Sequence, residues 1–248
     1  MHNYKLTIQY DGSKYHGWQI QQNAPTVQQT ITTALETLSG EPVSLIGAGR
    51  TDTGVHAFGQ VANFRCEKEI DIYRFQYSLN SMLPFEIAIS EMVEVPEEFH
   101  SRFDAVRRIY WYIIAKSKSP FYKNYTYFYH FKLSARQLNE YAAQFVGEKD
   151  YQAFAKELPG NGNTNCIVHG AQWRDTGDTL LFRIDANRYL HSMVRLIVGT
   201  QLRTIKENRP PEDIATIFRT NSKELVGQSV PAHGLFLVKV KYGNNSQL

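Results

Sequence analysis

The chain has 248 residues, a formal net charge of +3 and a hydrophobic fraction of 42%, which is typical of a globular protein with a sizeable core. No apolar run reaches the roughly 18 residues that a membrane-spanning helix needs. Cys66 and Cys166 are the only cysteines and lie far apart, which excludes a disulfide framework and a cysteine-rich metal site.

The first 100 residues alternate between predicted strands and helices. Apolar residues at every second position predict a strand over Tyr4–Tyr10, and no apolar signal-peptide segment precedes it, so we expect a cytoplasmic protein. Thr26 and Gln29 match a capping box, and Gly40 marks the end of the helix that follows. The further elements expected in this half are strands Val43–Ile46, Val61–Phe64 and Ile87–Val95 and a helix Ile72–Met82.

The second half repeats this rhythm. Ser134 and Gln137 form a second capping box, and Pro210-Pro211 opens a short helix. The other expected elements are strands Phe103–Ala115, Ala171–Trp173, Leu180–Ala186 and Leu235–Tyr242 and a long helix Leu190–Ile205. We therefore predict an α+β fold of two related lobes, residues 1–104 and 105–248, each a mixed or antiparallel sheet with helices on one face.

Charge is distributed unevenly between the two predicted lobes. Residues 1–104 hold 7 Lys and Arg against 13 Asp and Glu, a net of −6, whereas residues 105–248 hold 20 against 11, a net of +9. This asymmetry indicates that the second lobe binds a polyanion, although uneven surface charge without a partner gives the same pattern.

Residues 49–57 read Gly-Arg-Thr-Asp-Thr-Gly-Val-His-Ala and form the most informative segment. Arg50 and Asp52 stand two apart, so an extended backbone points both side chains to the same side. A carboxylate beside a guanidinium can serve as a nucleophile next to a group that contacts an anion or a base. Taken alone, the segment also fits an ordinary turn.

The segment from Arg102 to Arg136 is rich in cations and rings, with 8 Lys and Arg, one acidic residue and 11 aromatic residues. Cations follow a phosphate backbone and aromatic faces accept unstacked bases, so this composition favours nucleic-acid binding. A β-rich core with a basic polar face is the alternative. Strand alternation places Arg108, Tyr110 and Tyr112 on one face, where they can line a polar cleft.

On the predicted helix Leu190–Ile205, His191 and Arg195 stand four residues apart at the border of the apolar stripe. A partly buried arginine needs an anionic partner, and Asp52 is a candidate. An arginine that extends to solvent is the alternative.

Other kinds of site lack their motifs. Gly47-Ala48-Gly49 begins like a dinucleotide fingerprint, but Asp52 occupies the third glycine position. No phosphate-loop lysine, histidine spacing for a metal or Gly-x-Ser-x-Gly motif is present. Covalent serine hydrolysis and metal-dependent hydrolysis are therefore unsupported.

Taken together, five blocks resemble the tRNA pseudouridine synthase A (TruA) family over nearly the whole chain. They are Tyr10–Gly12 with Tyr15–Gln19, Gly49–Ala57, Arg108–Tyr112, His191–Arg195 with Gly199, and Pro231–Leu235. The chain departs from the family at three positions, with Arg108 in place of the usual Lys, Tyr189 in place of Phe and Val230 in place of Ala.

The resemblance implies a pseudouridine synthase fold whose two sheets meet at a central catalytic cleft. It implies an isomerase that converts uridine to pseudouridine at positions 38, 39 and 40 of the tRNA anticodon stem-loop, without metal or cofactor, as a homodimer. Asp52 would be the catalytic carboxylate, Arg195 its ion-pair partner, and Tyr110 the ring that stacks on the uracil near C5. Arg50 would fill the space left by the flipped nucleotide, and Leu235 would form an apolar pocket wall. Arg108 and His191 are further candidates for substrate or RNA contacts.

Two other hypotheses remain from the residues. One is an RNA-binding module of the same fold without catalysis, which the presence of Asp52, Tyr110 and Arg195 disfavours. The other is a nucleotide-binding enzyme in which Gly47–Gly54 cradles a phosphate. It predicts affinity for free nucleotides and none for tRNA.

Overall fold

A computed structural model describes residues 1–243, which divide into two compact units. The first unit comprises Met1–Val106 together with the stretch from Phe236 onward, and the second comprises Arg107–Leu235. The last strand thus groups with the first unit, whereas the predicted lobe boundary at residues 104 and 105 stays a prediction. Each unit combines a sheet with helices, so the α+β class expected from the sequence is confirmed.

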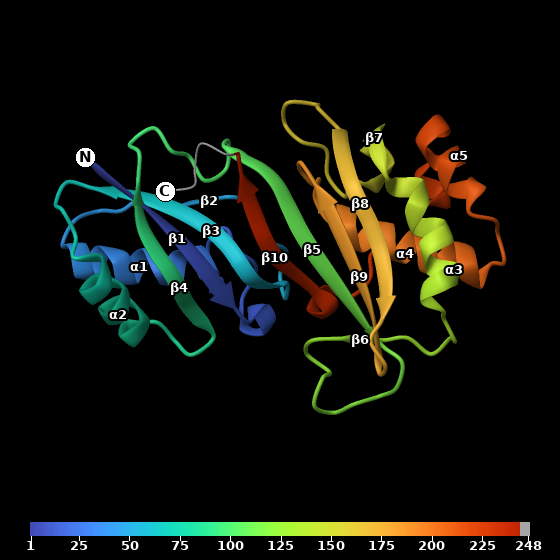
Figure 1. The fold of residues 1–248 in the computed structure, drawn as a ribbon, viewed down its shortest axis with the longest axis horizontal. Helices are drawn as coiled ribbons and strands as arrows, with labels where there is room; N and C mark the ends of the chain where they lie inside the picture. Colours follow the sequence, from blue (N-terminus) through green and yellow to red (C-terminus); the bar gives the residue numbers. More distant parts are fainter. Residues whose placement is uncertain (244–248) are drawn as a thin grey trace. The chain divides into compact units, whose positions relative to one another are not determined.

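The sheet of the first unit has the strand order β4-β1-β3-β10, with the short β2 paired to β3 (Figure 1). The pairs β1–β3 and β1–β4 are antiparallel, and β10 runs parallel to β3 with Phe236 opposite His56. The strands are β1 (His2–Tyr10), β2 (Ile46–Gly47), β3 (His56–Cys66), β4 (Ile87–Val95) and β10 (Leu235–Tyr242).

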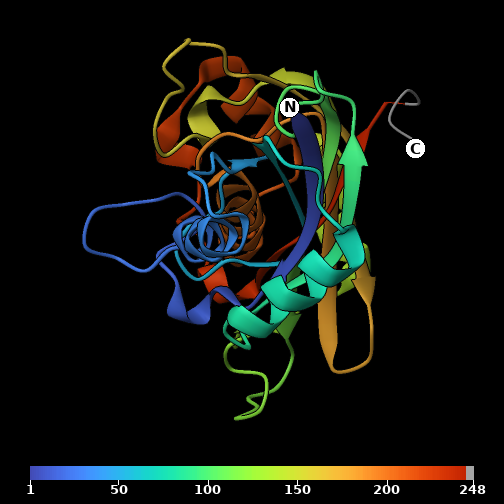
Figure 2. The same ribbon diagram turned by 90° about the vertical axis from the view of Figure 1, so that its left-hand side faces the viewer.

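Helices α1 (Val27–Ser39) and α2 (Ile72–Met82) cover one face of this sheet (Figure 2). Tyr4 and Phe64 point toward the helices, and Phe75 of α2 stacks on Phe64 with ring centroids 6.3 Å apart. Thr26 caps α1 as predicted by accepting a hydrogen bond from the backbone N–H of Gln29, and Gly40 ends it in a left-handed conformation.

The sheet of the second unit has the order β5-β9-β8-β7, with antiparallel pairs and with β6 parallel to β5. Its strands are β5 (Ala105–Ala115), β6 (Tyr127–Phe128), β7 (Gly147–Asp150), β8 (Asn165–Asp175) and β9 (Thr179–Ala186). Its helices are α3 (Ala135–Ala142), α4 (Met193–Lys206) and α5 (Glu212–Thr220).

Hydrogen bonds fix two of these helices to strand β8. The indole N–H of Trp173 donates to the side-chain oxygen of Gln201 on α4 at 2.9 Å. Asn139 of α3 accepts from the backbone N–H of Trp173 at 2.7 Å and donates to its carbonyl at 3.0 Å. Trp173 and Gln201 are fully buried, so these bonds satisfy polar groups inside the core.

Several predicted element bounds are wrong. Strand β3 begins at His56 and not at Val61, and β8 covers Asn165–Asp175 and not only Ala171–Trp173. The helix predicted over Leu190–Ile205 begins at Met193, because Ser192 adopts a left-handed conformation with φ of 58°. The strand predicted over Val43–Ile46 is reduced to Ile46–Gly47, the two residues that pair with β3. Within residues 1–243, none of the helices is long and apolar enough to cross a lipid bilayer.

Candidate active site

Asp52 lies in the loop that joins β2 to β3 in the first unit. Arg50 is exposed, Thr51 is buried and Asp52 is half-buried, which agrees with the predicted alternation. The Thr51 hydroxyl forms a 2.8 Å hydrogen bond with the phenol of Tyr10 at the end of β1. This inward anchor leaves Arg50 and Asp52 on the accessible side of the loop.

The segment that follows β1 holds the same loop through its backbone. The N–H of Trp18 donates to the carbonyl of Thr51 at 3.1 Å, and the N–H of Gly54 donates to the carbonyl of Tyr15 at 3.3 Å. Gly17 has a φ of 88°, and a Cβ there would lie 2.5 Å from the Thr51 carbonyl oxygen. Glycine is therefore required where the two backbones meet.

A buried histidine fixes the end of the loop where β3 begins. His56 is 2% exposed, and its Nδ1 accepts the backbone N–H of Gly12 at 3.0 Å. The carboxylate of Asp11 lies 3.1 Å from the same nitrogen. The ring of Phe236 stacks on His56 with centroids 4.8 Å apart.

Backbone N–H groups at both ends of this loop are engaged within the protein and cannot cradle a phosphate. Such a cradle needs several N–H groups that converge on one anion. The N–H of Ala48 instead donates to the carbonyl of Val61 at 2.7 Å, and that of Val55 to the carbonyl of Asp52 at 3.1 Å. With the bond from Gly54 to Tyr15, these contacts disfavour the nucleotide-binding hypothesis.

In the second unit, Tyr110 and Arg108 lie on β5 and share Tyr189 as a neighbour. Tyr110 is 8% exposed, and its ring meets that of Tyr189 edge to face with centroids 5.0 Å apart. The Tyr189 phenol donates to the carbonyl of Arg108 at 3.2 Å. The Arg108 guanidinium donates to the carbonyl of Asn187 at 2.7 Å. Arg108 and Tyr189, two of the departures from the family pattern, are therefore in direct contact.

Arg195 lies in the first turns of α4 and is half-buried. Its Nε donates to the carbonyl of Val230 at 2.7 Å, and the N–H of Val230 donates to the Arg195 carbonyl at 3.3 Å. Close backbone packing keeps this segment on the helix, because a Cβ at Gly199 would lie 1.8 Å from the Gln228 carbonyl oxygen. The bonds to Val230 fix the direction of the Arg195 side chain.

Leu235 follows the segment that Arg195 holds and is 6% exposed. The preceding Gly234 packs against Tyr112, where a Cβ would lie 2.9 Å from the ring. The Tyr112 phenol donates to the carbonyl of Pro231 at 2.9 Å, and burial raises the pKa of this phenol. A neutral tyrosine of β5 thus fixes the turn that leads to Leu235.

His191 is not on the same helix as Arg195, because α4 begins at Met193. Its Nδ1 lies 3.2 Å from a carboxylate oxygen of Glu157, and its carbonyl accepts the N–H of Lys156 at 3.1 Å. The predicted four-residue helical spacing between His191 and Arg195 is therefore wrong. The structure associates His191 with the turn at residues 156 and 157.

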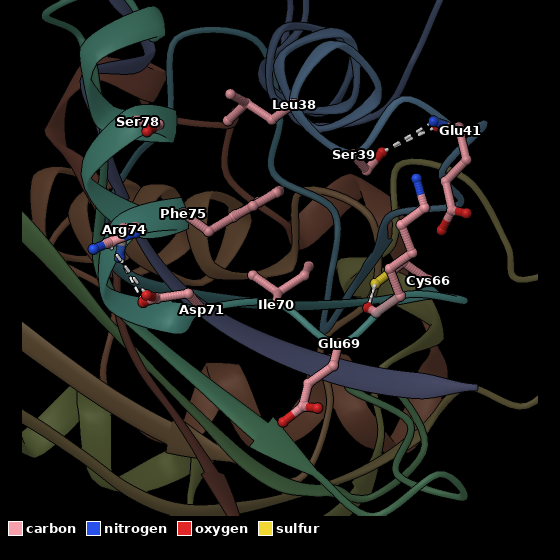
Figure 3. Close-up of a pocket in the computed structure, with 11 residues that line it drawn as sticks. Leu38, Ser39, Glu41, Cys66, Glu69, Ile70, Asp71, Arg74, Phe75 and Ser78 are labelled. Atoms are coloured by element: carbon pink, nitrogen blue, oxygen red, sulfur yellow. Dashed lines mark hydrogen bonds and ion pairs between the residues drawn. The ribbon is translucent and has the colours of Figure 1, made fainter.

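A hollow of about 350 Å³ in the first unit is lined by other residues (Figure 3). Leu38, Ile70 and Phe75 form its apolar lining, near the end of α1 and the start of α2. Cys66 also lines it, and burial raises the pKa of its thiol, which donates to the carbonyl of Lys68. None of the predicted site residues lines this hollow. Within the described chain, no three His, Cys, Asp or Glu side chains are grouped to hold a metal ion.

The residues that support the site have no role in the sequence-based predictions. Tyr10, Gly17 and Trp18 hold the Asp52 loop, and Val230 holds Arg195. Two glycines within one short stretch, Gly12 and Gly17, were the available signal, since both are needed for close backbone approach.

Comparison with known proteins gives a consistent assignment. The tRNA pseudouridine synthase family matches residues 6–104 and 141–243, which include Asp52 and Arg195 but not Tyr110. The tRNA pseudouridine synthase A of Thermoanaerobacter sp. (strain X514) is 37% identical over 98% of this chain and 100% of the relative. The proteins of that name from Caldicellulosiruptor bescii and Acetivibrio thermocellus are 38% and 40% identical, each over 98% of this chain and 100% of the relative. The chain therefore belongs to the tRNA pseudouridine synthase family.

Proposed function

We propose that this protein converts uridine to pseudouridine in tRNA, at positions 38, 39 and 40 of the anticodon stem-loop. The observation that carries the proposal is the family match together with full-length relatives that bear the name tRNA pseudouridine synthase A. The match covers the loop that presents Asp52, the residue on which the chemistry depends.

The reaction exchanges one glycosidic bond for another without a change in composition. The bond between uracil N1 and ribose C1′ breaks, the base turns, and a bond forms between C5 and C1′. The proton on C5 leaves and N1 gains one, so the atoms balance and no redox partner is needed.

In this proposal, Asp52 is the catalytic carboxylate. It either attacks the nucleotide or removes a ribose proton, and both routes need an ionised, oriented carboxylate shielded from water. Its half-buried position on a loop anchored by Tyr10 and Trp18 supports this role. Arg195 is the proposed ion-pair partner, and its bonds to Val230 support a fixed direction for the guanidinium.

The remaining residues are proposed to bind the nucleotide. Tyr110 stacks on the uracil and lies near C5, where a proton must leave, Leu235 forms an apolar wall, and Arg50 fills the space of the flipped nucleotide. The exposure of Arg50 and the burial of Leu235 support these roles. Arg108 and His191 are proposed as outer RNA contacts, and both reach the surface of the second unit.

We further propose that the enzyme works as a homodimer in the cytoplasm, with one tRNA across both subunits. Recognition by RNA shape and phosphates suits an enzyme that acts on neighbouring positions. The excess of basic residues in the second half of the chain supports polyanion binding.

The test is direct. The purified protein is incubated with an unmodified tRNA transcript that has uridines at positions 38–40, and pseudouridine is mapped by chemical labelling. We expect pseudouridine at these positions and none in a matched transcript with cytidines there. A transcript that stays unmodified, or that is modified elsewhere in the molecule, would contradict the proposed function.

A further inference from the structure

Residues 116–133, here called the aromatic loop, connect β5 to the start of α3 in the second unit (Figure 1). The loop contains Lys116, Lys118, Lys123 and Lys132, and no Asp or Glu occurs between Ala105 and Asn139. It lies between the two stretches that the family matches, residues 6–104 and 141–243. The family assignment therefore gives no role to this loop.

Large rings on this loop face solvent. The exposed fraction is 84% for Phe121, 60% for Tyr122 and 53% for Phe131. Folding favours the burial of such rings, so adjacent exposed rings usually mark a binding surface. Phe121 and Tyr122 are neighbours in the chain and are the two most exposed Phe and Tyr rings of the loop.

The backbone behind these rings is ordered by hydrogen bonds. The carbonyl of Tyr122 accepts the N–H of Tyr125 at 2.9 Å and that of Thr126 at 3.0 Å. The hydroxyl of Thr126, a residue that is 9% exposed, donates to the same carbonyl. Tyr127 then pairs with Ile114 of β5. Binding at Phe121 and Tyr122 therefore requires little ordering of the chain.

The charges next to the two rings are cationic and available. Lys118 and Lys123 flank the rings in sequence and are exposed. Within residues 1–243 neither forms an ion pair, whereas Lys116 pairs with Asp175 at 2.5 Å. No carboxylate lies nearby in the chain. Exposed rings flanked by unpaired ammonium groups suit a single-stranded nucleic acid, because its bases can stack on the rings and its phosphates attract the ammonium groups.

We propose that the aromatic loop is a separate RNA contact, in which Phe121 and Tyr122 stack on an unpaired base of the tRNA and Lys118 and Lys123 contact the adjacent phosphates. The base must be unpaired, because a base within an A-form stem exposes no ring face. This inference rests on the proposed function, from which it takes tRNA as the substrate.

The main experiment measures the affinity for a fluorescently labelled, unmodified tRNA transcript by anisotropy at fixed salt. The double variant Phe121→Ala/Tyr122→Ala should raise Kd about tenfold or more, since stacking on one base has about this effect. Kd for a fully paired RNA of equal length should change less than twofold. The matched control is Tyr73→Ala/Tyr77→Ala on α2, whose rings are 82% and 71% exposed, and it should bind tRNA like the wild type. Equal losses for both RNAs, or no loss, would overturn the stacking assignment.

Further double variants distinguish base stacking from hydrophobic docking and test the phosphate contacts. Phe121→Leu/Tyr122→Leu keeps apolar surface without a ring face and should bind as weakly as the alanine variant, while Phe121→Tyr/Tyr122→Phe should bind like the wild type. Wild-type affinity of the leucine variant would instead indicate a hydrophobic docking surface for protein. Lys118→Gln/Lys123→Gln should reduce the slope of log K against log salt by about 1.4, the value for two single-strand phosphates. An unchanged slope would contradict the phosphate contacts.

The outcome is distinguishable from a failure of the proposed function. If the wild type forms no pseudouridine in the transcript, the proposed function fails. If the wild type forms pseudouridine and the alanine variant binds the transcript with unchanged Kd, the aromatic-loop assignment alone is overturned.

Discussion

Asp52, the proposed catalytic residue, is held in position by Thr51, whose side chain points to the opposite side of the loop. Thr51 turns into the first unit, where its hydroxyl meets Tyr10 and its carbonyl meets the N–H of Trp18. Asp52, one residue later, is left half-buried on the opposite side. The position of the carboxylate is therefore fixed by the backbone on which it stands.

Tyr110 allows a test of a single oxygen atom. Tyr110→Phe keeps the ring and its edge-to-face contact with Tyr189 but removes the hydroxyl that is proposed to lie near the uracil C5. Because general acid–base groups contribute about 10²–10⁴-fold, we expect the rate of pseudouridine formation to fall at least about 100-fold. The affinity for tRNA should stay within a few fold. Single-turnover kinetics and a binding titration measure the two effects.

The control removes the other phenol of the same ring pair. Tyr189→Phe deletes the hydroxyl that donates to the Arg108 carbonyl and restores the ring that the family usually has there. Its rate should stay close to that of the wild type. If Tyr110→Phe is equally active, its hydroxyl takes no part in the reaction.

At the scale of elements, the site depends on one close crossing between the segment after β1 and the loop before β3. Gly17 combines a φ of 88° with a Cβ position 2.5 Å from the Thr51 carbonyl oxygen. Gly17→Ala must therefore strain its own backbone and displace the Asp52 loop. We expect the free energy of unfolding to fall by about 2–3 kcal/mol, of which left-handed strain accounts for about 1–2 kcal/mol.

Gly40 provides the matched control for this substitution. It has a φ of 74° in the same unit, and a Cβ there meets no atom within 4 Å. Gly40→Ala should thus show the conformational cost without the collision and leave pseudouridine formation unchanged. Urea unfolding and activity compare the two variants. Equal losses of stability and activity would argue against the crossing as the support of Asp52.

Hydrophobic periodicity and capping residues predict the helices and strands whose bounds depend only on residues within the segment. Helix Ile72–Met82 and strands Ile87–Val95 and Leu235–Tyr242 have the predicted bounds, because hydrophobic periodicity and capping residues lie within each segment. The start of α4 was missed because the left-handed turn at Ser192 breaks a helical pattern that continues through Leu190. Val43 and Leu45 are apolar residues two positions apart, as in a half-buried strand, but β2 pairs with β3 only at Ile46 and Gly47.

Local sequence patterns do not indicate the contacts of the candidate site that join residues distant in the chain. Their two-residue spacing predicts that the side chains of Arg50 and Asp52 lie on one side of the loop. The greater exposure of both relative to Thr51 agrees with this prediction. The anchors of their loop come from Tyr10 and Trp18, more than one element away in the chain, so no local pattern indicates them. Likewise, the sequence indicates the strand Leu235–Tyr242 but not its parallel pairing with β3.

At the scale of the molecule, charge separates the two units. The first unit has 9 Lys and Arg against 13 Asp and Glu, a net of −4, and the second has 18 against 11, a net of +7. Binding of tRNA through the second unit would release counterions from several phosphates. We expect log K to fall with log salt with a slope of about −3 or steeper, which corresponds to roughly four phosphates. A flat titration would show that phosphates are not the main contact.

Asp52→Asn tests whether the Asp52 carboxylate performs the isomerisation. Asparagine keeps the size of the side chain and its capacity for hydrogen bonds but has neither the charge nor the nucleophilic oxygen of the carboxylate. Pseudouridine formation in an unmodified tRNA transcript is measured at saturating enzyme, together with tRNA affinity. We expect pseudouridine formation to be abolished while Kd stays within a few fold. Turnover near the wild-type rate would show that the carboxylate is not required.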